Sequence, residues 1–593
     1  MCGIAGVINL ASPPDPAIAA RIADALAHRG PDDRGLWNDH RAALAHRRLS
    51  VIDPGPAGHQ PMTTPDGRFV LSYNGELYND ADLRAELESQ GVRFQTHCDT
   101  ETVLHALARW GLAARDKLRG MYALALWDTI EHRLMLARDE LGVKPLSFAK
   151  LSPRELVFAS EPAALFQHPR LSPRPDPVGV ANYLAVVQVT LGRRTLFEGV
   201  ESLEPGEWLT VDASGIELAS TTHAPTWHTD PPHARSTRDT VAESTRLHLR
   251  ADVPTCCLLS GGLDSAALSS LALDTLPALD TYCAGSKDPA ATSEDFEHAR
   301  TVADRIGSRH TEAPVSKSLF EERWPELIHA AGLPLCTPNE VAINEVARTL
   351  RADGKIVTLS GEGADELFAG YAIPLTLAHQ HIASTPDTAT DPFHALATIT
   401  WVHAKQRAAV LNAPIDDSEI IERFARLHAD TAAQINADFP NVEEPERRLH
   451  TILRLQRRVN LPNLLRRLDQ ATMLASVEGR TPYADRVVAR HAETLPLADR
   501  FRPDEVNPGT KLALRNAFAD RLPASVVERP KASFPLPFES WLDAALPALD
   551  TPFAREHFTP EARAELTANP ANLWTIAWPT LNLALWGQRW WGG

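Results

Sequence analysis

Apolar and polar positions over the first 165 residues follow patterns that predict short strands mixed with helices. Apolar residues at three- and four-residue spacing predict a helix over residues 16–28 that ends at Gly30-Pro31. The same spacing predicts a helix capped by Asn79 and another over residues 99–110. Strands are expected over 69–73, 121–127 and 133–138. This mixture favours a layered α+β domain.

Residues 237–375 alternate between apolar strands and amphipathic helices, which is typical of a parallel α/β sheet. In chain order we expect helix 237–250, strand 255–259, helix 263–273, strand 280–284, helix 294–307, helix 339–352 and strand 355–359. The remainder is mostly helical, with helical apolar spacing at 449–461 and 510–521. We interpret the helical stretch 376–447 as packing around this second core.

Composition limits the possible classes of protein. A chain of 593 residues is long enough for several domains, and a proline-rich break followed by a hairpin-like stretch over 196–218 places a junction near residue 200. We therefore expect one domain over residues 1–200 and a second over 201–593. The net charge of −17 disfavours binding to nucleic acid or anionic membranes. Six cysteines without metal-site spacing favour a reducing, cytoplasmic environment.

The strongest local signal is SGGLDS at residues 260–265, directly after a predicted strand and at the start of a predicted helix. Its two glycines allow a tight turn and close approach to a phosphate, and a helix N-terminus directs N–H groups at an anion. Ser260 and Ser265 add hydroxyl donors, and Asp264 can hold a cation. An ordinary glycine turn is the alternative, and the GxxxxGK[ST] loop is not found. The pattern predicts a phosphate site.

A second loop, LSGEGADELF at residues 359–368, follows another apolar strand. Ligands gather at the carboxyl ends of strands in an open α/β sheet, so we expect both loops to face one crevice. Glu362, Asp365 and Glu366 bring carboxylates to this phosphate site, an arrangement that suits Mg²⁺. Alone, the loop is better interpreted as an acidic surface; the pairing with SGGLDS favours a metal.

Cys2 is the third candidate. If Met1 is removed, one residue carries both a thiol and a free α-amine, and the amine can accept the thiol proton. A buried small side chain near a terminus is the alternative interpretation. The motifs elsewhere in the chain favour the nucleophile.

These motifs occur with many others in an order typical of one family. The matching stretches are MCGIAG (1–6), HRGPDD (28–33), HRRLSVID (46–53), GHQPM (58–62), YNGELYN (73–79), CDTE (98–101), RGMYALALWD (119–128), ARDELGVKPL (137–146), FASEPAAL (158–165), SGGLDS, LSGEGADELFAGY (359–371), SVEGRTPYAD (476–485), TKLALR (510–515) and LPASVVERPKASFP (522–535). Over nearly its whole length the chain resembles the glutamine-dependent, glutamine-hydrolysing asparagine synthetases. The resemblance implies an α+β N-terminal-nucleophile glutaminase domain, an αββα sandwich, followed by an α/β pyrophosphate-loop ATPase domain of the adenine nucleotide α-hydrolase-like kind.

The resemblance assigns glutamine hydrolysis to the first domain. Cys2 would attack the side-chain amide, and Asn74 with the backbone N–H of Gly75 would stabilise the oxyanion. Arg48 would bind the carboxylate of glutamine, and two acids would bind its ammonium. The implied glutamine-binding set is Arg48, Leu49, Ser50, Val51, Ile52, Asn74, Gly75, Glu76 and Asp99.

The second domain would join the carboxylate of aspartate to the α-phosphate of ATP, which makes AMP the later leaving group and releases pyrophosphate. Glu362 aligns with the residue needed to form this adenylate, and Lys511 would neutralise phosphate charge. Asp264 and Asp365 would hold Mg²⁺. The implied ATP contacts are Leu258, Ser260, Gly261, Gly262, Asp264, Ser265, Ala284, Ser360 and Gly361.

The remaining expectations also come from the family. Ammonia would pass between the domains through an internal channel, and the partners would be the small molecules glutamine, aspartate and ATP. We carry a homodimer as a hypothesis. Lys144 and Lys531 are assigned to structural or domain-interface roles.

Several positions depart from the family pattern, namely Ala284, Ala369, Gly479, Thr481, Tyr483 and Ala484. We interpret them as neutral repacking, while an acceptor other than aspartate, such as a cell-wall or secondary-metabolite acid, stays open. Intact Cys2, Asn74 and Asp99 argue against a β-lactam-forming synthetase. Intact Asp264, Asp365 and Lys511 argue against a non-catalytic binding protein.

Overall fold

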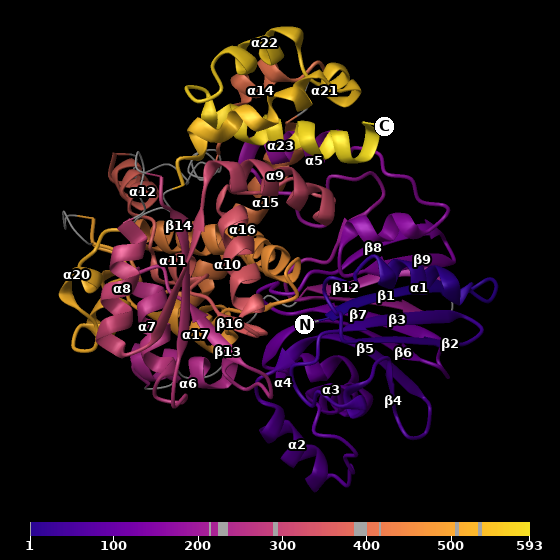
Figure 1. Cartoon of the computed structure of the whole chain (residues 1–593). Helices are drawn as coiled ribbons and strands as arrows, with labels where there is room; N and C mark the ends of the chain where they lie inside the picture. The colour runs from indigo at the N-terminus through magenta and orange to yellow at the C-terminus, as the bar shows by residue number, and fades with distance from the viewer. Residues whose placement is uncertain are drawn as a thin grey trace.

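The computed structural model describes residues 2–212, 215–222, 235–288, 294–384, 400–413, 417–503, 509–531 and 536–592. Two six-stranded antiparallel sheets form the amino-terminal part (Figure 1). The first has the order β10 (Glu201–Ser202), β8 (Ser147–Ser152), β9 (Glu155–Ala159), β1 (Cys2–Asn9), β3 (Ala42–Arg48) and β2 (Asp33–Asn38). The second has the order β12 (Gly215–Thr222), β11 (Glu207–Asp212), β7 (Arg133–Arg138), β6 (Gly120–Asp128), β5 (Phe69–Leu77) and β4 (Met62–Thr63).

The two sheets pack face to face, with helices on their outer faces. Ile4, Leu44, Val70, Trp127 and Phe158 belong to the buried cluster between the sheets. α1 (Pro16–Asp24) packs against β1 and β3, while α2 (Asp80–Ser89) and α3 (Asp99–Trp110) share a core with the far face of the second sheet. This layering confirms the predicted αββα sandwich.

The carboxyl-terminal part is built on a five-stranded parallel sheet. Its order is β15 (Arg309–Val315), β14 (Asp280–Ser286), β13 (Thr255–Leu258), β16 (Val357–Leu359) and β17 (Glu478–Arg480). The helices that connect and cover these strands include α6 (Thr237–His248), α7 (Leu263–Ala272), α8 (Glu294–Ile306), α9 (Lys317–Ala331), α10 (Asn339–Ala352), α11 (Ala364–Phe368), α16 (Glu444–Met473) and α17 (Arg486–Thr494). The parallel sheet confirms the predicted α/β architecture.

Further helices cover this core. They are α5 (Pro177–Val186), α12 (Ala372–Ser384), α14 (Ala404–Val410), α15 (Ser418–Asp438), α18 (Leu497–Arg500), α19 (Leu512–Phe518), α20 (Ala524–Val527), α21 (Pro552–His557), α22 (Pro560–Ala568) and α23 (Trp574–Trp591), with the short α4 (Ala114–Lys117) in the first part. Short 3-10 helices lie at Pro56–Gly58, Gly111–Ala113, Pro162–Gln167, Pro482–Ala484 and Phe538–Asp550. α15 packs on α16 through Ile420, Phe424, Leu455 and Val459, as expected for part of the stretch 376–447.

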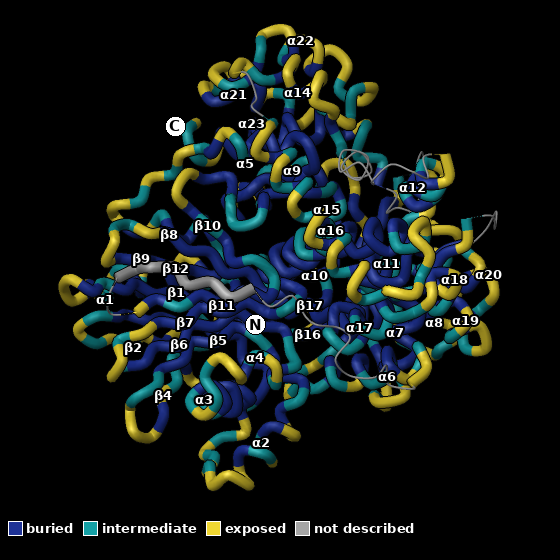
Figure 2. The backbone as a smooth tube through the Cα atoms, turned by 180° about the vertical axis from the view of Figure 1, so that it is seen from behind, coloured by how far each residue is buried: buried dark blue, intermediate teal, exposed yellow. Residues whose placement is uncertain are grey.

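The chain crosses between its two parts later than residue 200. β10 pairs with β8, β11 pairs with β7 and β12 pairs with β11, so these three strands extend the sheets of the first part. We therefore propose that the junction falls between β12 and α6, in place of the division at residue 200. Figure 2 shows the central strands of both parts as buried, with exposed residues concentrated at peripheral loops and helices. Within the described ranges, no helix combines the length and apolarity that crossing a bilayer requires.

An aromatic cluster anchors the carboxyl-terminal helices. Trp578 on α23 stacks on Trp324 of α9 with ring centroids 4.8 Å apart, and Phe320 packs against both. Both indole rings are fully buried, and the Trp324 Nε1–H donates to Asn582 Oδ1 at 2.9 Å. The cluster ties α9 to the end of the chain.

We expect Trp578→Ala to lower the free energy of unfolding by about 3–5 kcal/mol, because it leaves a large cavity among packed rings. Urea unfolding would measure the change. Ile373→Ala is the control, since that side chain is 75% exposed and its loss should change stability by about 0.5 kcal/mol or less. Equal stability of the two variants would contradict the packing described here.

Candidate active sites

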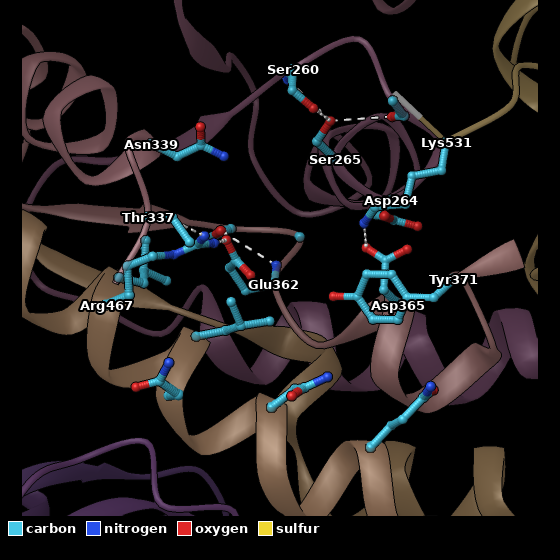
Figure 3. A pocket seen from close by; sticks show the side chains of 18 of the residues that line it. Ser260, Asp264, Ser265, Thr337, Asn339, Glu362, Asp365, Tyr371, Arg467 and Lys531 are labelled. Atoms are coloured by element: carbon cyan, nitrogen blue, oxygen red, sulfur yellow. Dashed lines mark hydrogen bonds and ion pairs between the residues drawn. The ribbon is translucent and has the colours of Figure 1, made fainter. Parts of the chain in front are cut away.

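A cavity of about 640 Å³ lies at the carboxyl ends of the neighbouring parallel strands β13 and β16 (Figure 3). Of the residues assigned to ATP, catalysis or metal in this domain, the cavity is lined by Leu258, Ser260, Gly262, Asp264, Ser265, Ser360, Gly361, Glu362, Asp365 and Lys511. Gly261 and Ala284 are the two assigned residues that do not line it. The expectation that the two loops face one crevice is therefore met.

The loop after β13 is a tight turn that opens α7. Ser260 N–H donates to Ser265 Oγ at 3.1 Å, and Ser265 Oγ donates to the Gly262 carbonyl at 3.2 Å. Gly261 has a φ of +72°, and a Cβ there would lie 2.5 Å from His298 Cβ, so only glycine fits. The first residues of α7 line the cavity, and the unpaired N–H groups of a helix's first turn favour an anion there.

Four charged side chains that line this cavity form a connected set of ion pairs. Lys511 Nζ lies 2.6 Å from Asp264 Oδ2 and 2.7 Å from Asp365 Oδ1, and Lys531 also pairs with Asp365. Burial opposes the charged forms, yet the carboxylates hold the pKa of Lys511 well above its usual value. The two lysines likewise hold the pKa of Asp365 well below its usual range. Lys531 thus belongs to the cavity, which differs from the structural role assigned to it.

Asp264 and Asp365 fit a role as metal ligands. Asp264 Oδ1 is buried and has no hydrogen-bond partner among the described residues. Carboxylate oxygens are the ligands Mg²⁺ prefers, and the cation usually retains water and substrate phosphate oxygens. Glu366, the third acid of this loop, hydrogen-bonds Tyr371 and does not line the cavity.

Glu362 is held by an arginine that the sequence did not single out. Arg467 on α16 pairs with Glu362, and its Nη1 donates to Thr337 Oγ1 at 2.9 Å. Figure 3 shows Glu362 and Arg467 together on one side of the cavity, with Asp264, Asp365 and Lys531 on the other. The cavity therefore has the Glu362–Arg467 pair on one side and the ion pairs of Asp264 and Asp365 on the other.

Three departures from the family pattern have visible consequences. Ala369 ends α11 with a φ of +63°, a left-handed conformation that favours glycine, so alanine is strained there. Tyr483 donates its hydroxyl to the Asp264 carbonyl at 3.2 Å. Gly479 packs against α16, where a Cβ would lie 3.2 Å from Leu468 Cγ. Tyr483 and Gly479 thus lie against Asp264 and Leu468, two residues that line the cavity.

A second site surrounds Cys2 at the start of β1. The backbone N–H of Cys2 donates to Asn74 Oδ1 at 2.9 Å, while Asn74 Nδ2 is buried without a hydrogen-bond partner among the described residues. Burial raises the pKa of the Cys2 thiol. Gly75 has no room for a side chain, since a Cβ would lie 2.3 Å from the Met121 carbonyl oxygen. The Asn74 side chain thus contacts Cys2, whose thiol is buried, and its Nδ2 remains available to donate a hydrogen bond.

Arg48 has a different set of contacts from the one assigned to it. Its guanidinium donates to the backbone carbonyls of Gly55 at 2.9 Å, Ile52 at 3.0 Å and Asp53 at 2.6 Å. Arg48 therefore shapes the loop that follows Leu49–Ile52, the stretch implied to contact glutamine. Binding of the glutamine carboxylate by Arg48 stays a prediction.

Glu76 and Asp99 are both buried near this site. Glu76 Oε1 lies 3.2 Å from Arg480 Nη2, and burial raises the pKa of Glu76 well above its usual value. Asp99 Oδ2 accepts from the Leu77 N–H at 2.8 Å, and burial raises the pKa of Asp99 to about 6. Arg480 comes from β17, so the second part of the chain contributes to this site.

Comparisons with known proteins match both parts. A family described as a glutamine amidotransferase domain matches residues 1–223, and one described as asparagine synthase matches residues 236–586. These limits agree with a junction between β12 and α6.

Two relatives that match most of the chain are named as glutamine-hydrolysing asparagine synthetases, and a shorter match is named an amidase. A putative glutamine-hydrolysing asparagine synthetase of Mycobacterium tuberculosis is 32% identical, covering 92% of this chain and 89% of its own. Asparagine synthetase 1 of Bacillus subtilis, also glutamine-hydrolysing, is 29% identical over 91% of this chain and 88% of its own. A protein named amidase chry2, from Gibberella zeae, is 28% identical over 63% of this chain and 59% of its own. The chain therefore belongs to the glutamine-hydrolysing asparagine synthetase family, ligases that join a glutamine amidotransferase domain to an asparagine synthase domain.

Proposed function

We propose that this chain amidates L-aspartate to L-asparagine with nitrogen from glutamine, converting ATP to AMP and pyrophosphate. One observation carries the proposal: a single cavity brings together the SGGLDS turn, the Asp264–Lys511–Asp365 cluster and Glu362. The turn suits pyrophosphate, the cluster suits a metal–nucleotide complex, and the acid lies opposite both.

In the first half-reaction the Cys2 sulfur attacks the amide carbon of glutamine. The backbone nitrogen that bonds Asn74 becomes the α-amine if Met1 is removed, and it can accept the thiol proton. The uncommitted Asn74 Nδ2 can donate to the oxyanion as it forms. The carbon–nitrogen bond breaks as the proton passes to the departing ammonia, and water then hydrolyses the thioester to glutamate.

In the second half-reaction a carboxylate oxygen of the acceptor attacks the α-phosphate of ATP, and pyrophosphate leaves. The backbone N–H groups at the start of α7 hold the phosphates, while Lys511 and Lys531 offset their negative charge. Asp264 and Asp365 would hold Mg²⁺, which supplies further charge neutralisation. We assign Glu362, oriented by Arg467, to formation of the adenylate. Ammonia then attacks the acyl carbon and AMP departs.

A different carboxylate acceptor is the second candidate, and the shape of the cavity supports it. Gln456, Asn460 and Asn463 follow one face of α16 and line the cavity with Gln188 and Trp401. The amide side chains among these residues can hydrogen-bond an acceptor larger than aspartate. A panel of acids distinguishes the two candidates.

We expect aspartate to give the fastest ATP-dependent pyrophosphate release among free amino acids, with AMP formed in equal amount. An enzyme-coupled pyrophosphate assay with glutamine present would measure this. Asp264→Asn is the matched control: it should lose pyrophosphate release by about a hundredfold or more and still hydrolyse glutamine. Release that depends on another acid, with aspartate inert, would favour the second candidate, and formation of ADP would exclude both.

Cys2→Ala should abolish synthesis from glutamine and leave synthesis from added ammonia within about twofold of the original enzyme, because only the thiol nucleophile is lost. Product formation by liquid chromatography with each nitrogen source would test this. Retained glutamine-dependent synthesis would show that the nucleophile lies elsewhere. Loss of both activities in a folded variant would contradict the division into two sites.

Glutamine binding should weaken in acid because Asp99, with a pKa of about 6, loses its charge as the pH falls. If Asp99 binds the ammonium of glutamine, the KM for glutamine should rise about tenfold per pH unit below that value and level off above it. In Asp99→Asn the KM should be high throughout, which separates Asp99 from nearby Glu76. A KM for glutamine that stays constant between about pH 7.5 and 5.5 would contradict the role.

A further inference from the structure

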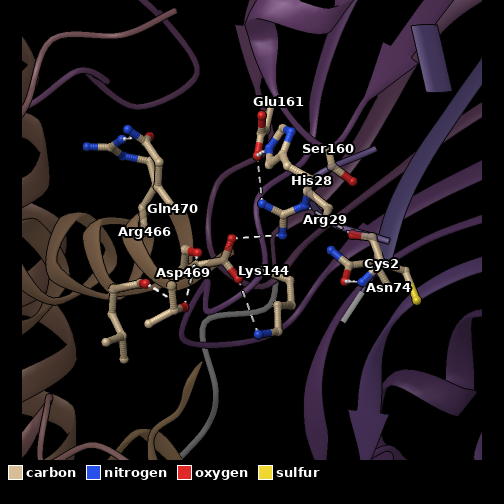
Figure 4. A network of polar contacts seen from close by, with 12 residues as sticks. Cys2, His28, Arg29, Asn74, Lys144, Ser160, Glu161, Arg466, Asp469 and Gln470 are labelled. Carbon is tan, nitrogen blue, oxygen red and sulfur yellow. Dashed lines mark hydrogen bonds and ion pairs between the residues drawn. The ribbon is translucent and has the colours of Figure 1, made fainter. Parts of the chain in front are cut away.

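Four charged side chains form a buried network beside the Cys2 site (Figure 4). Arg29 Nη1 lies 2.8 Å from Glu161 Oε1, and Arg29 Nη2 lies 2.8 Å from Asp469 Oδ2. Lys144 Nζ lies 3.3 Å from Asp469 Oδ1. The side chains of Arg29 and Lys144 are fully buried, and that of Asp469 is 2% exposed. Two cations and two anions thus balance one another away from water.

Arg29 connects this network to the proposed nucleophile. Its Nε donates to the Cys2 carbonyl at 3.1 Å, while its two terminal nitrogens are held by the acids. A guanidinium is planar, so fixing its far edge also fixes its near edge. The position of the Cys2 backbone therefore depends on what holds Arg29.

Asp469 is the one member of this network that comes from the synthetase part. It lies on α16, whereas Arg29 follows α1, Lys144 precedes β8 and Glu161 follows β9. The same helix carries Arg467, which pairs with Glu362 in the ATP cavity. α16 thus places one charged side chain toward each site.

Burial of Arg29 and Lys144 makes the carboxylate of Asp469 necessary to the network. A buried cation without a partner is strongly disfavoured, and Asp469 pairs with two buried cations, one at each carboxylate oxygen. Without its carboxylate, Lys144 would lose its ion pair, and Arg29 would keep only Glu161, which also contacts His28 Nε2 at 3.1 Å. Arg29 would then lose its contact with Asp469, one of the two contacts that orient the guanidinium.

We propose that Asp469 is a positioning residue of the glutaminase, supplied by the synthetase domain, which holds Arg29 against the Cys2 carbonyl. The amidotransferase site is accordingly complete only when α16 is docked against it. This inference rests on the proposed role of Cys2 as the glutamine-hydrolysing nucleophile.

The test compares glutamate release from glutamine with ammonia-driven pyrophosphate release, in the full-length protein. Asp469→Asn should lower kcat for glutamine hydrolysis by at least about tenfold, change KM by less than about threefold and leave ammonia-driven turnover within about twofold. Gln470→Met is the matched control, because Gln470 follows Asp469 on α16 but its side chain bonds Arg466 and not the network. The control should hydrolyse glutamine as the original enzyme does.

A double-mutant cycle separates positioning from general destabilisation. Arg29→Lys keeps the positive charge but lacks the planar guanidinium with its several N–H donors. It should therefore lose glutaminase activity to a similar extent as Asp469→Asn. The combined variant should be little worse than either one, since both remove the same contact. If Asp469→Asn fails to fold, Asp469→Asn combined with Lys144→Gln restores the charge balance and should show the same loss of kcat.

The outcomes that overturn the inference are distinct. Unchanged glutamine hydrolysis in Asp469→Asn, equal loss of ammonia-driven turnover, or additive effects in the cycle would each show that Asp469 does not position the nucleophile. If the original enzyme released no glutamate from glutamine at all, the proposed function would fall together with this inference.

Discussion

Ion pairs buried across the boundary between the two domains fix how the domains meet. Arg29 of the first domain pairs with Asp469 of the second at 2.8 Å, Glu76 pairs with Arg480 at 3.2 Å, and Arg119 pairs with Asp485 at 2.9 Å. Each pair would leave a buried charge without its partner if the domains slid past each other, so the interface resists sliding. The two sites are therefore connected through these pairs at the domain interface.

At each of the two sites, a glycine allows the backbone to come close to a neighbouring element. In the proposed account the cavity holds the phosphates of ATP. Glycine at 261 lets the backbone turn close to α8, and Lys511 lies between two acids. A thiol must be held beside an uncommitted amide, and glycine at 75 lets β5 and β6 approach there. In the proposed account α16 lies between these places, with Arg467 facing one and Asp469 the other.

Sequence patterns predicted what depends on local periodicity and on contiguous motifs. The helices over 99–110 and 339–352 have the predicted bounds, and the two loops line one cavity as expected. β15 was not predicted, because this edge strand, Arg309–Val315, alternates weakly and is mostly polar. Arg467 and Asp469 were not singled out, since their partners lie 105 and 440 residues away and no local pattern reports such pairings. The carbonyl contacts of Arg48 depend on a loop geometry that its motif does not encode.

The central claim is that nitrogen released at Cys2 is used at the cavity beside Glu362 without equilibrating with solvent. The most direct measurement supplies glutamine labelled with ¹⁵N at its amide, together with excess unlabelled ammonium, and determines the label in the product amide by mass spectrometry. The account predicts a product amide labelled to nearly the same extent as the glutamine. A label diluted to the composition of the ammonium pool would contradict it.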